Sequence, residues 1–239
     1  EDNVRTVVVQ VRDTVPILIV NGKASADRFE RASEYLRLSL NPFPAGEEPR
    51  GFPLRPKVVT PSIFKDMTEA DLEHYDCIYW CDVGHFEVAD VRKIDSHLRR
   101  GGGFVVTMGD RAAENLKTYN DLLYKDGHGL LPAKLEQHKT EQGAKNSVLA
   151  PADHYFYLQN TDNAAYMLPP LQAFNEEADR LTLRTARFRQ YVLSTVAEGK
   201  GRVVLSFMPE VMITEKEKKQ KPANLPIAAP AIVEWNPAL

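Results

Sequence analysis

The sequence predicts an α/β fold, a three-layer sandwich built around a mostly parallel β-sheet. Between residues 16 and 132, short apolar runs alternate with segments of helical periodicity, the order expected of parallel strands joined by helices. The runs are continuously apolar, as is typical of strands that helices cover on both faces. A glycine triplet at 101–103 separates a helical segment from the next apolar run, where a helix has to end and the chain has to reverse.

The most complete part of this pattern is one β–α–β unit. An apolar run at 77–83 predicts a strand, the segment 88–99 predicts a helix, and a second apolar run at 104–108 predicts the next strand. Gly109 and Asp110 follow this second strand at its carboxyl end. Because doubly wound sheets bind their ligands at the carboxyl ends of strands, we expect a site of this chain to lie there.

The remaining elements follow from local signals, such as the helix-start box formed by Thr68 and Asp71. Before the β–α–β unit we expect strands at 4–12 and 17–20, a helix at 27–40, a loop at 45–56 and a short strand at 57–61. After it we expect a loosely helical segment at 112–123, a turn at 127–132, two strands at 191–196 and 202–208 joined by a turn at 198–201, and irregular structure over 209–239. Residues 136–190 give no clear pattern.

Composition and charge argue against several classes of function. A net charge of −3 provides no basic surface for nucleic acid or for an anionic membrane. The two cysteines, Cys77 and Cys81, lie on one expected strand roughly 13 Å apart, too far for a disulfide. No Cys or His pair at zinc spacing accompanies them, and the glycine triplet precedes a strand, unlike a nucleotide-binding loop. We therefore expect neither a metal nor a cofactor.

The extent of the chain favours a piece of a longer protein. It starts at Glu1 without an initiator methionine, and it stops after Trp235 without a clear terminal element. No apolar run reaches the roughly 18 residues that span a bilayer. We expect a soluble domain of a larger parent protein.

An ordered series of motifs resembles the class I glutamine amidotransferase-like fold, which has a flavodoxin-like sheet. More narrowly, it resembles the amidotransferase-like domain of large bacterial membrane proteins that also carry a von Willebrand factor A domain. The matching segments are VPILIVNG (15–22), EYLRLSLNP (34–42), YDCIYWCDV (75–83), LRRGGGFVVTMGD (98–110) and GLLPAKL (129–135). The resemblance implies a membrane-anchored parent, with the extracytoplasmic side favoured, and partners among its other domains or envelope proteins. It divides the chain into a strand or linker from a preceding immunoglobulin-like domain at 1–13, the amidotransferase-like domain at 14–210 and an irregular segment at 211–239.

The same resemblance implies a degenerate catalytic triad. Class I amidotransferases carry a G-x-C-x-G elbow and a later F-H-P-E segment. Here Thr107 stands at the cysteine position, Met208 stands at the histidine position, and Glu210 remains. A threonine hydroxyl needs an adjacent base, and a methionine thioether cannot take a proton, so we do not expect glutaminase activity by this route.

Cys81 offers a different route to catalysis. It lies near the carboxyl end of its strand with His85 four residues later, and a cysteine with a histidine in reach can act as a nucleophile–base pair. The competing interpretation is that Cys81 packs as a small apolar residue in a buried strand, as free cysteines commonly do. We favour packing, because a strand cysteine lacks the helix N-terminus that lowers a thiol pKa.

Polar and glycine residues at the strand ends outline a possible crevice. Its candidate members are Asn21, Gly22, Asp82, Gly84, Met108, Gly109 and Asp110. Such a ring can bind a cation or a polar ligand, whereas an acid like Asp110 can instead cap the following helix. We favour the capping role for Asp110.

Together these features predict a non-catalytic amidotransferase-like domain that serves as a binding or interaction module of a larger bacterial envelope protein. Two alternatives stay open. One is an amide hydrolase or amidotransferase that uses Cys81. The other is a small-metabolite (sugar) binding domain of the related trehalose-utilisation type.

Overall fold

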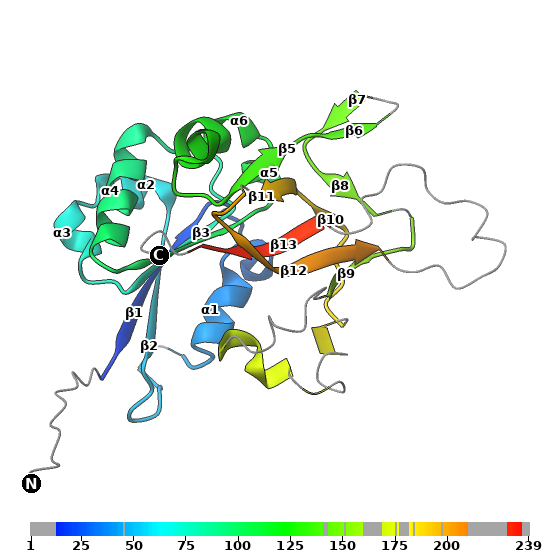
Figure 1. The fold of residues 1–239 in the computed structure, drawn as a ribbon. Helices are drawn as coiled ribbons and strands as arrows, with labels where there is room; N and C mark the ends of the chain where they lie inside the picture. Colours follow the sequence, from blue (N-terminus) through cyan, green and yellow to red (C-terminus); the bar gives the residue numbers. More distant parts are fainter. Residues whose placement is uncertain are drawn as a thin grey trace, which may run out of the picture. The chain divides into compact units, whose positions relative to one another are not determined.

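A computed structural model gives the fold shown in Figure 1. The structure describes residues 13–44, 46–140, 143–150, 152–159, 169–174, 176, 182–183, 185–196, 198–209 and 229–235. The chain divides into two compact units, Glu1–Thr107 and Met108–Leu239, and each is described by itself. The strand expected at 4–12 lies outside the described residues.

The first unit is built on a four-stranded parallel sheet in the order β2-β1-β3-β4. Its strands are β1 (Val15–Asn21), β2 (Leu54–Val59), β3 (Cys77–Cys81) and β4 (Gly103–Thr107). Helices flank this sheet, which confirms the predicted α/β fold with a flavodoxin-like sandwich.

Helix α1 (Glu34–Leu40) covers one face of the sheet (Figure 1). On this face Ile17, Ile19 and Cys81 form a buried cluster, and Leu36 and Leu40 of α1 pack against it. Alternate residues of a strand point to opposite faces, so the continuous apolar runs of β1 and β3 supply both layers of the core.

The opposite face carries α2 (Pro61–Asp66), α3 (Glu69–Leu72) and α4 (Val88–Arg99). Trp80 of β3 anchors this layer, and its ring centroid lies 5.7 Å from that of Phe64 in α2 and 5.4 Å from that of Phe104 in β4. Helix α4 contributes the buried side chains of Val91 and Ile94. The sheet is therefore the middle one of three layers.

The end of α4 explains the glycine triplet. Gly101 adopts a φ of 91°, a conformation that glycine accepts without steric cost. A Cβ atom on Gly102 would lie 2.1 Å from Nε2 of His97, so the triplet also makes room for a buried histidine. Both features let the chain turn directly from α4 into β4.

Some predicted elements of the first unit are confirmed and others are wrong. Helix α4 has the predicted limits, and the Thr68–Asp71 capping box is present. The helix predicted at 27–40 is wrong in its first half, where a 3-10 turn, η1 (Arg28–Glu30), precedes the shorter α1. The turn forms because the Asp27 carboxylate accepts a hydrogen bond from the backbone N–H of Phe29. Strand β2 also starts earlier than predicted, at Leu54.

The second unit combines short helices with small antiparallel sheets. Its helical segments are α5 (Asp110–Ala113), α6 (Leu116–Tyr119), the π-helical turn η2 (Asn120–Tyr124), η3 (Lys125–Gly127) and η5 (Pro169–Phe174). Its strands are β5 (Ala133–Glu136), β6 (His138–Thr140), β7 (Gly143–Lys145), β8 (Val148–Leu149), β9 (Phe156–Gln159), β10 (Gln190–Tyr191), β11 (Leu193–Val196), β12 (Arg202–Pro209) and β13 (Ala229–Glu234). The largest of its sheets has the order β13-β12-β9.

Strand pairing in the second unit corrects two predictions. The strands β11 and β12 do not form a hairpin across the turn at 198–200, because β11 pairs with β5 while β12 pairs with β13 and β9. Irregular structure over 209–239 was also wrong for β13, which pairs along most of β12. Residues 210–228 and 236–239 lie outside the described part of the chain.

Candidate functional site

The carboxyl edge of the parallel sheet brings together three of the sequence-predicted positions. Asn21, Cys81 and Thr107 end neighbouring strands and are paired in register, Asn21 with Cys81 and Cys81 with Thr107. The backbone bonding continues one residue further, from the N–H of Gly22 to the carbonyl of Cys81 at 2.8 Å and from the N–H of Asp82 to the carbonyl of Thr107 at 3.0 Å. This edge is the place where the sequence predicted a crevice.

Backbone packing closes this edge between β1 and β3. Asp82 is buried and adopts a φ of 54°, an uncommon left-handed conformation for a residue with a side chain. A Cβ atom on Gly22 would lie 1.9 Å from the carbonyl oxygen of Asp82. Gly84 is also buried. Glycine at position 22 therefore allows the backbone after β1 to lie directly against the backbone after β3.

Cys81 lies inside the apolar layer beneath α1. Its exposure is 1%, and it belongs to the cluster with Ile17 and Ile19. Burial raises the pKa of the Cys81 thiol above its ordinary value, and a hydrogen bond from the Thr107 hydroxyl offsets part of that rise. His85 is exposed in the loop after β3, and no hydrogen bond joins it to Cys81 within the described residues.

Thr107, which the resemblance predicted to stand at a nucleophile position, is exposed at the end of β4. Its hydroxyl lies 3.5 Å from the carbonyl oxygen of Trp80, at the limit of a hydrogen bond. Among the described residues, no histidine or carboxylate bonds to this hydroxyl. The threonine has no general base in contact.

Met208 and Glu210, the other positions predicted from the resemblance to form a degenerate triad, come later in the sequence. Met208 is a half-buried residue of β12 and pairs in register with Tyr157 of β9. Glu210 lies outside the described residues. Thus Thr107 and Met208 belong to different units of the chain.

The remaining crevice candidates surround the start of α5. Met108 and Gly109 connect β4 to this helix, and Gly109 occupies its N-cap position. Asp110 is the first residue of α5, and its carboxylate accepts a hydrogen bond from the side-chain amide of Gln190. No group of three or more His, Cys, Asp or Glu residues suited to a metal ion occurs in the described part of the chain.

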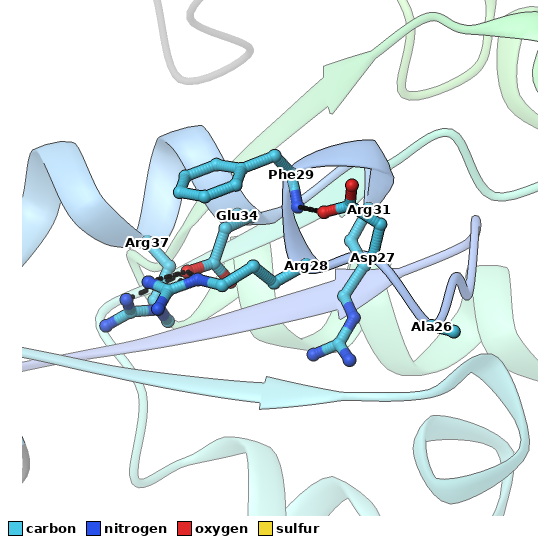
Figure 2. A pocket seen from close by; sticks show the side chains of 7 residues that line it. All are labelled: Ala26, Asp27, Arg28, Phe29, Arg31, Glu34 and Arg37. Carbon is cyan, nitrogen blue, oxygen red and sulfur yellow. Dashed lines mark hydrogen bonds and ion pairs between the residues drawn. The ribbon is translucent and has the colours of Figure 1, made fainter.

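A hollow that the sequence did not predict lies at the 3-10 turn and the start of α1 (Figure 2). Its volume is about 750 Å³. Its lining residues are Ala26, Asp27, Arg28, Phe29, Arg31, Glu34 and Arg37. We call this the arginine hollow.

One buried carboxylate organises the arginine hollow. Oε1 of Glu34 accepts hydrogen bonds from Nη2 of Arg28 at 2.8 Å and from Nη2 of Arg37 at 3.0 Å, and the Nε atoms of both arginines lie within 3.3 Å of it. The hydrogen bonds from Arg37, with those from Arg28, lower the pKa of Glu34 although burial alone would raise it. Glu34 is therefore a carboxylate that holds two guanidinium groups in place.

The third arginine and two aromatic rings complete the surface. Arg31 donates from Nε to the carbonyl of Ser25 at 2.9 Å and forms no ion pair with any described residue. Phe29 and Tyr35 are 50% and 68% exposed, with ring centroids 5.9 Å apart, and the guanidinium of Arg28 lies 5.0 Å from the Phe29 ring. No sequence signal pointed to the hollow, because its three arginines do not share one face of the helix expected at 27–40.

The comparisons with known proteins give one structural likeness. No family model matches the chain, and no curated protein matches it. A crystal structure of a protein described as ThuA-like, from Bacteroides uniformis ATCC 8492, is similar at 10% sequence identity with a TM-score of 0.40, over 98% of this chain and 80% of that chain. No helix in the described residues is long and apolar enough to cross a membrane. A likeness of this size assigns the chain neither a family nor an activity.

Proposed function

We propose that this chain is a non-catalytic binding module with an amidotransferase-like fold, a domain of a larger bacterial envelope protein. The observation that carries the proposal is the burial of Cys81, the thiol at the carboxyl edge of the sheet. The envelope context is supported by the series of motifs between residues 15 and 135.

Burial argues against a nucleophilic role for Cys81 on chemical grounds. The thiolate is the reactive form of cysteine, and a charge in an apolar layer is costly. The pKa of this thiol is raised, which reduces the thiolate fraction at neutral pH. Cys81 is only 1% exposed, so a substrate could not reach its sulfur atom without local rearrangement of the packed layer that contains it.

The elbow position argues in the same direction. A threonine attacks an amide only when a base accepts its proton, and none is in contact with Thr107 among the described residues. The exposed hydroxyl of Thr107 is thus accessible without being activated. The two candidate nucleophiles fail for different reasons, since Cys81 is buried and Thr107 has no general base in contact among the described residues.

Amide hydrolysis tests this proposal directly. The purified chain is incubated with glutamine and a panel of simple amides, and ammonia release is compared with that of Cys81→Ala and Thr107→Val variants. We expect no turnover above background in any of them. Turnover by the unchanged protein that either substitution abolishes would overturn the non-catalytic assignment.

A further inference from the structure

The arginine hollow concentrates positive charge on a chain that is negative overall. Three arginines line it against two carboxylates, those of Asp27 and Glu34, while the whole chain has a net charge of −3. Both carboxylates are engaged, since Asp27 accepts from the backbone N–H of Phe29 and Glu34 accepts from two arginines. Three arginines against two carboxylates leave the hollow with a net charge of +1, with the Glu34 carboxylate buried and paired and the Asp27 carboxylate exposed.

Arg31 has the greatest remaining capacity to bind an anion. A guanidinium group has five N–H donors in a planar fork that matches carboxylate and phosphate oxygens. Among the described residues, Arg31 donates from Nε alone, to the carbonyl of Ser25, and this bond holds the base of the fork in place. Figure 2 shows the guanidinium of Arg31 apart from the group that Arg28, Glu34 and Arg37 form.

The two flanking arginines are fixed in position before any ligand binds. The side chain of Glu34 is 8% exposed and pairs with both, whereas the side chains of Arg28 and Arg37 are 52% and 28% exposed. Each therefore keeps a solvent-facing edge while its orientation is set. Fixing side chains in advance lowers the entropy lost on binding.

The volume of the hollow suits a small molecule. The volume of about 750 Å³ falls within the range of roughly 300 to 1,000 Å³ that is typical of ligand pockets. The exposed ring of Phe29 lines the hollow beside the Arg28 guanidinium and offers apolar area to the rest of the ligand, and the ring of Tyr35 packs against Phe29. An anionic head group with a compact body would use both features.

We propose that the arginine hollow binds a small molecule through a carboxylate or phosphate group. Arg31 makes the principal contact with this group, and Arg28 and Arg37 make flanking contacts. This inference rests on the binding-module function and names its ligand class. Glu34 acts as a positioning residue that orients the two flanking arginines.

The test uses inorganic phosphate and malonate as separate probes at constant ionic strength. Binding to the whole chain is followed by calorimetry and by the melting temperature, which a ligand of the folded state raises. We expect at least one probe to bind saturably, and the preferred probe distinguishes a phosphate from a carboxylate ligand. Arg31→Gln should weaken that binding by about tenfold or more, because it removes the charge-assisted hydrogen bonds of the guanidinium fork to the anion.

Two further variants test whether the affinity for the anion depends on the planar guanidinium group of Arg31 or only on positive charge. Arg31→Lys keeps the charge and loses the planar fork, so its affinity should lie between those of the unchanged protein and Arg31→Gln. Arg99→Gln removes the same charge from an exposed arginine of α4 that pairs with Asp95, and it should bind as the unchanged protein does. Circular dichroism confirms that each variant is folded.

Three results would overturn the inference. They are the absence of saturable binding by either probe, equal binding by Arg31→Gln, and binding of an Asp/Glu-rich peptide alone, which would indicate a protein partner. None of these depends on amide hydrolysis. Turnover that requires Cys81 would instead refute the non-catalytic function and leave the binding result to stand by itself.

Discussion

The carboxyl edge of the sheet and the arginine hollow are two contrasting regions of the first unit. At the edge, Cys81 and Asp82 are buried, and Gly22 allows the two strand ends to meet through their backbones. In the hollow, Arg28 and Arg31 carry charge to an exposed surface. The comparison shows that backbone packing can close the carboxyl ends of parallel strands, where ligands usually bind in such sheets. The exposed charged side chains lie instead in the loop and helix that follow β1.

The largest expected effect on stability comes from placing a side chain at Gly22, where the ends of β1 and β3 meet. Gly22→Ala places a methyl group where 1.9 Å separates it from the carbonyl oxygen of Asp82, so the backbone has to move. We expect a loss of about 3 kcal/mol in the free energy of unfolding, measured by urea denaturation. Gly101→Ala is the control, because it meets no atom within 4 Å and incurs only the left-handed backbone strain, roughly 1–2 kcal/mol. Equal losses for the two variants would contradict a tightly packed edge.

The second effect concerns the carboxylate of the arginine hollow. Glu34→Gln removes the charge that holds Arg28 and Arg37, and we expect a loss of about 1 kcal/mol at pH 7, a modest figure because water screens the exposed guanidinium groups. The pKa of Glu34 is lowered in the folded state, so the stability it contributes is complete above its ordinary value of 4.5 and is lost as the pH falls through the folded value. The difference in the free energy of unfolding between the unchanged protein and Glu34→Gln should therefore become smaller as the pH falls.

Glu30→Gln is the matched control for this comparison. Its carboxylate is exposed and accepts a hydrogen bond from the Ser25 hydroxyl, and it pairs with no arginine among the residues that the structure describes. Urea denaturation between pH 3 and 7 should show little difference between this variant and the unchanged protein. A Glu34→Gln gap that stayed constant over the same range would indicate that the carboxylate charge does not organise the hollow.

The smallest expected effect concerns the buried histidine His97 and the dependence of stability on pH. Burial, the largest cause, lowers the pKa of His97 below its ordinary value of 6.5. The unfolded chain then binds a proton that the folded chain does not, so this residue makes stability fall as the pH drops below 6.5. His97→Gln should flatten the dependence of the free energy of unfolding on pH between pH 7 and 5, measured by urea denaturation. If His97→Gln and the unchanged protein showed the same dependence of unfolding free energy on pH, the lowered pKa of His97 would be contradicted.

Local sequence signals predicted the elements whose limits are fixed locally. Helix α4 was predicted residue by residue because its apolar period ends at a glycine triplet that has to reverse the chain. The helix at 27–40 was overextended because its apolar stripe continues through η1, and the Asp27 hydrogen bond that favours the turn is not visible in periodicity. The pairing of β12 with β13 joins distant segments, and no local signal specifies it.

The candidate site was predicted less well than the fold. The sequence located the strand ends and favoured packing for Cys81, which the structure buries. It did not show that Gly22 and Asp82 meet, because that contact joins two strands. It also missed the hollow, since the position of Arg31 depends on a turn that breaks the expected helix. The sugar-binding alternative stays a prediction.

The reactivity of Cys81 tests the central claim most directly. In a Cys77→Ala background, which leaves Cys81 as the remaining thiol, labelling by a soluble thiol reagent is followed in the folded and in the urea-unfolded protein. We expect folded Cys81 to react only as slowly as the protein opens, at every pH from 6 to 9, and to react rapidly once unfolded. Rapid labelling of the folded protein, with a thiol pKa below about 8.5, would reveal an accessible nucleophile and contradict a non-catalytic module.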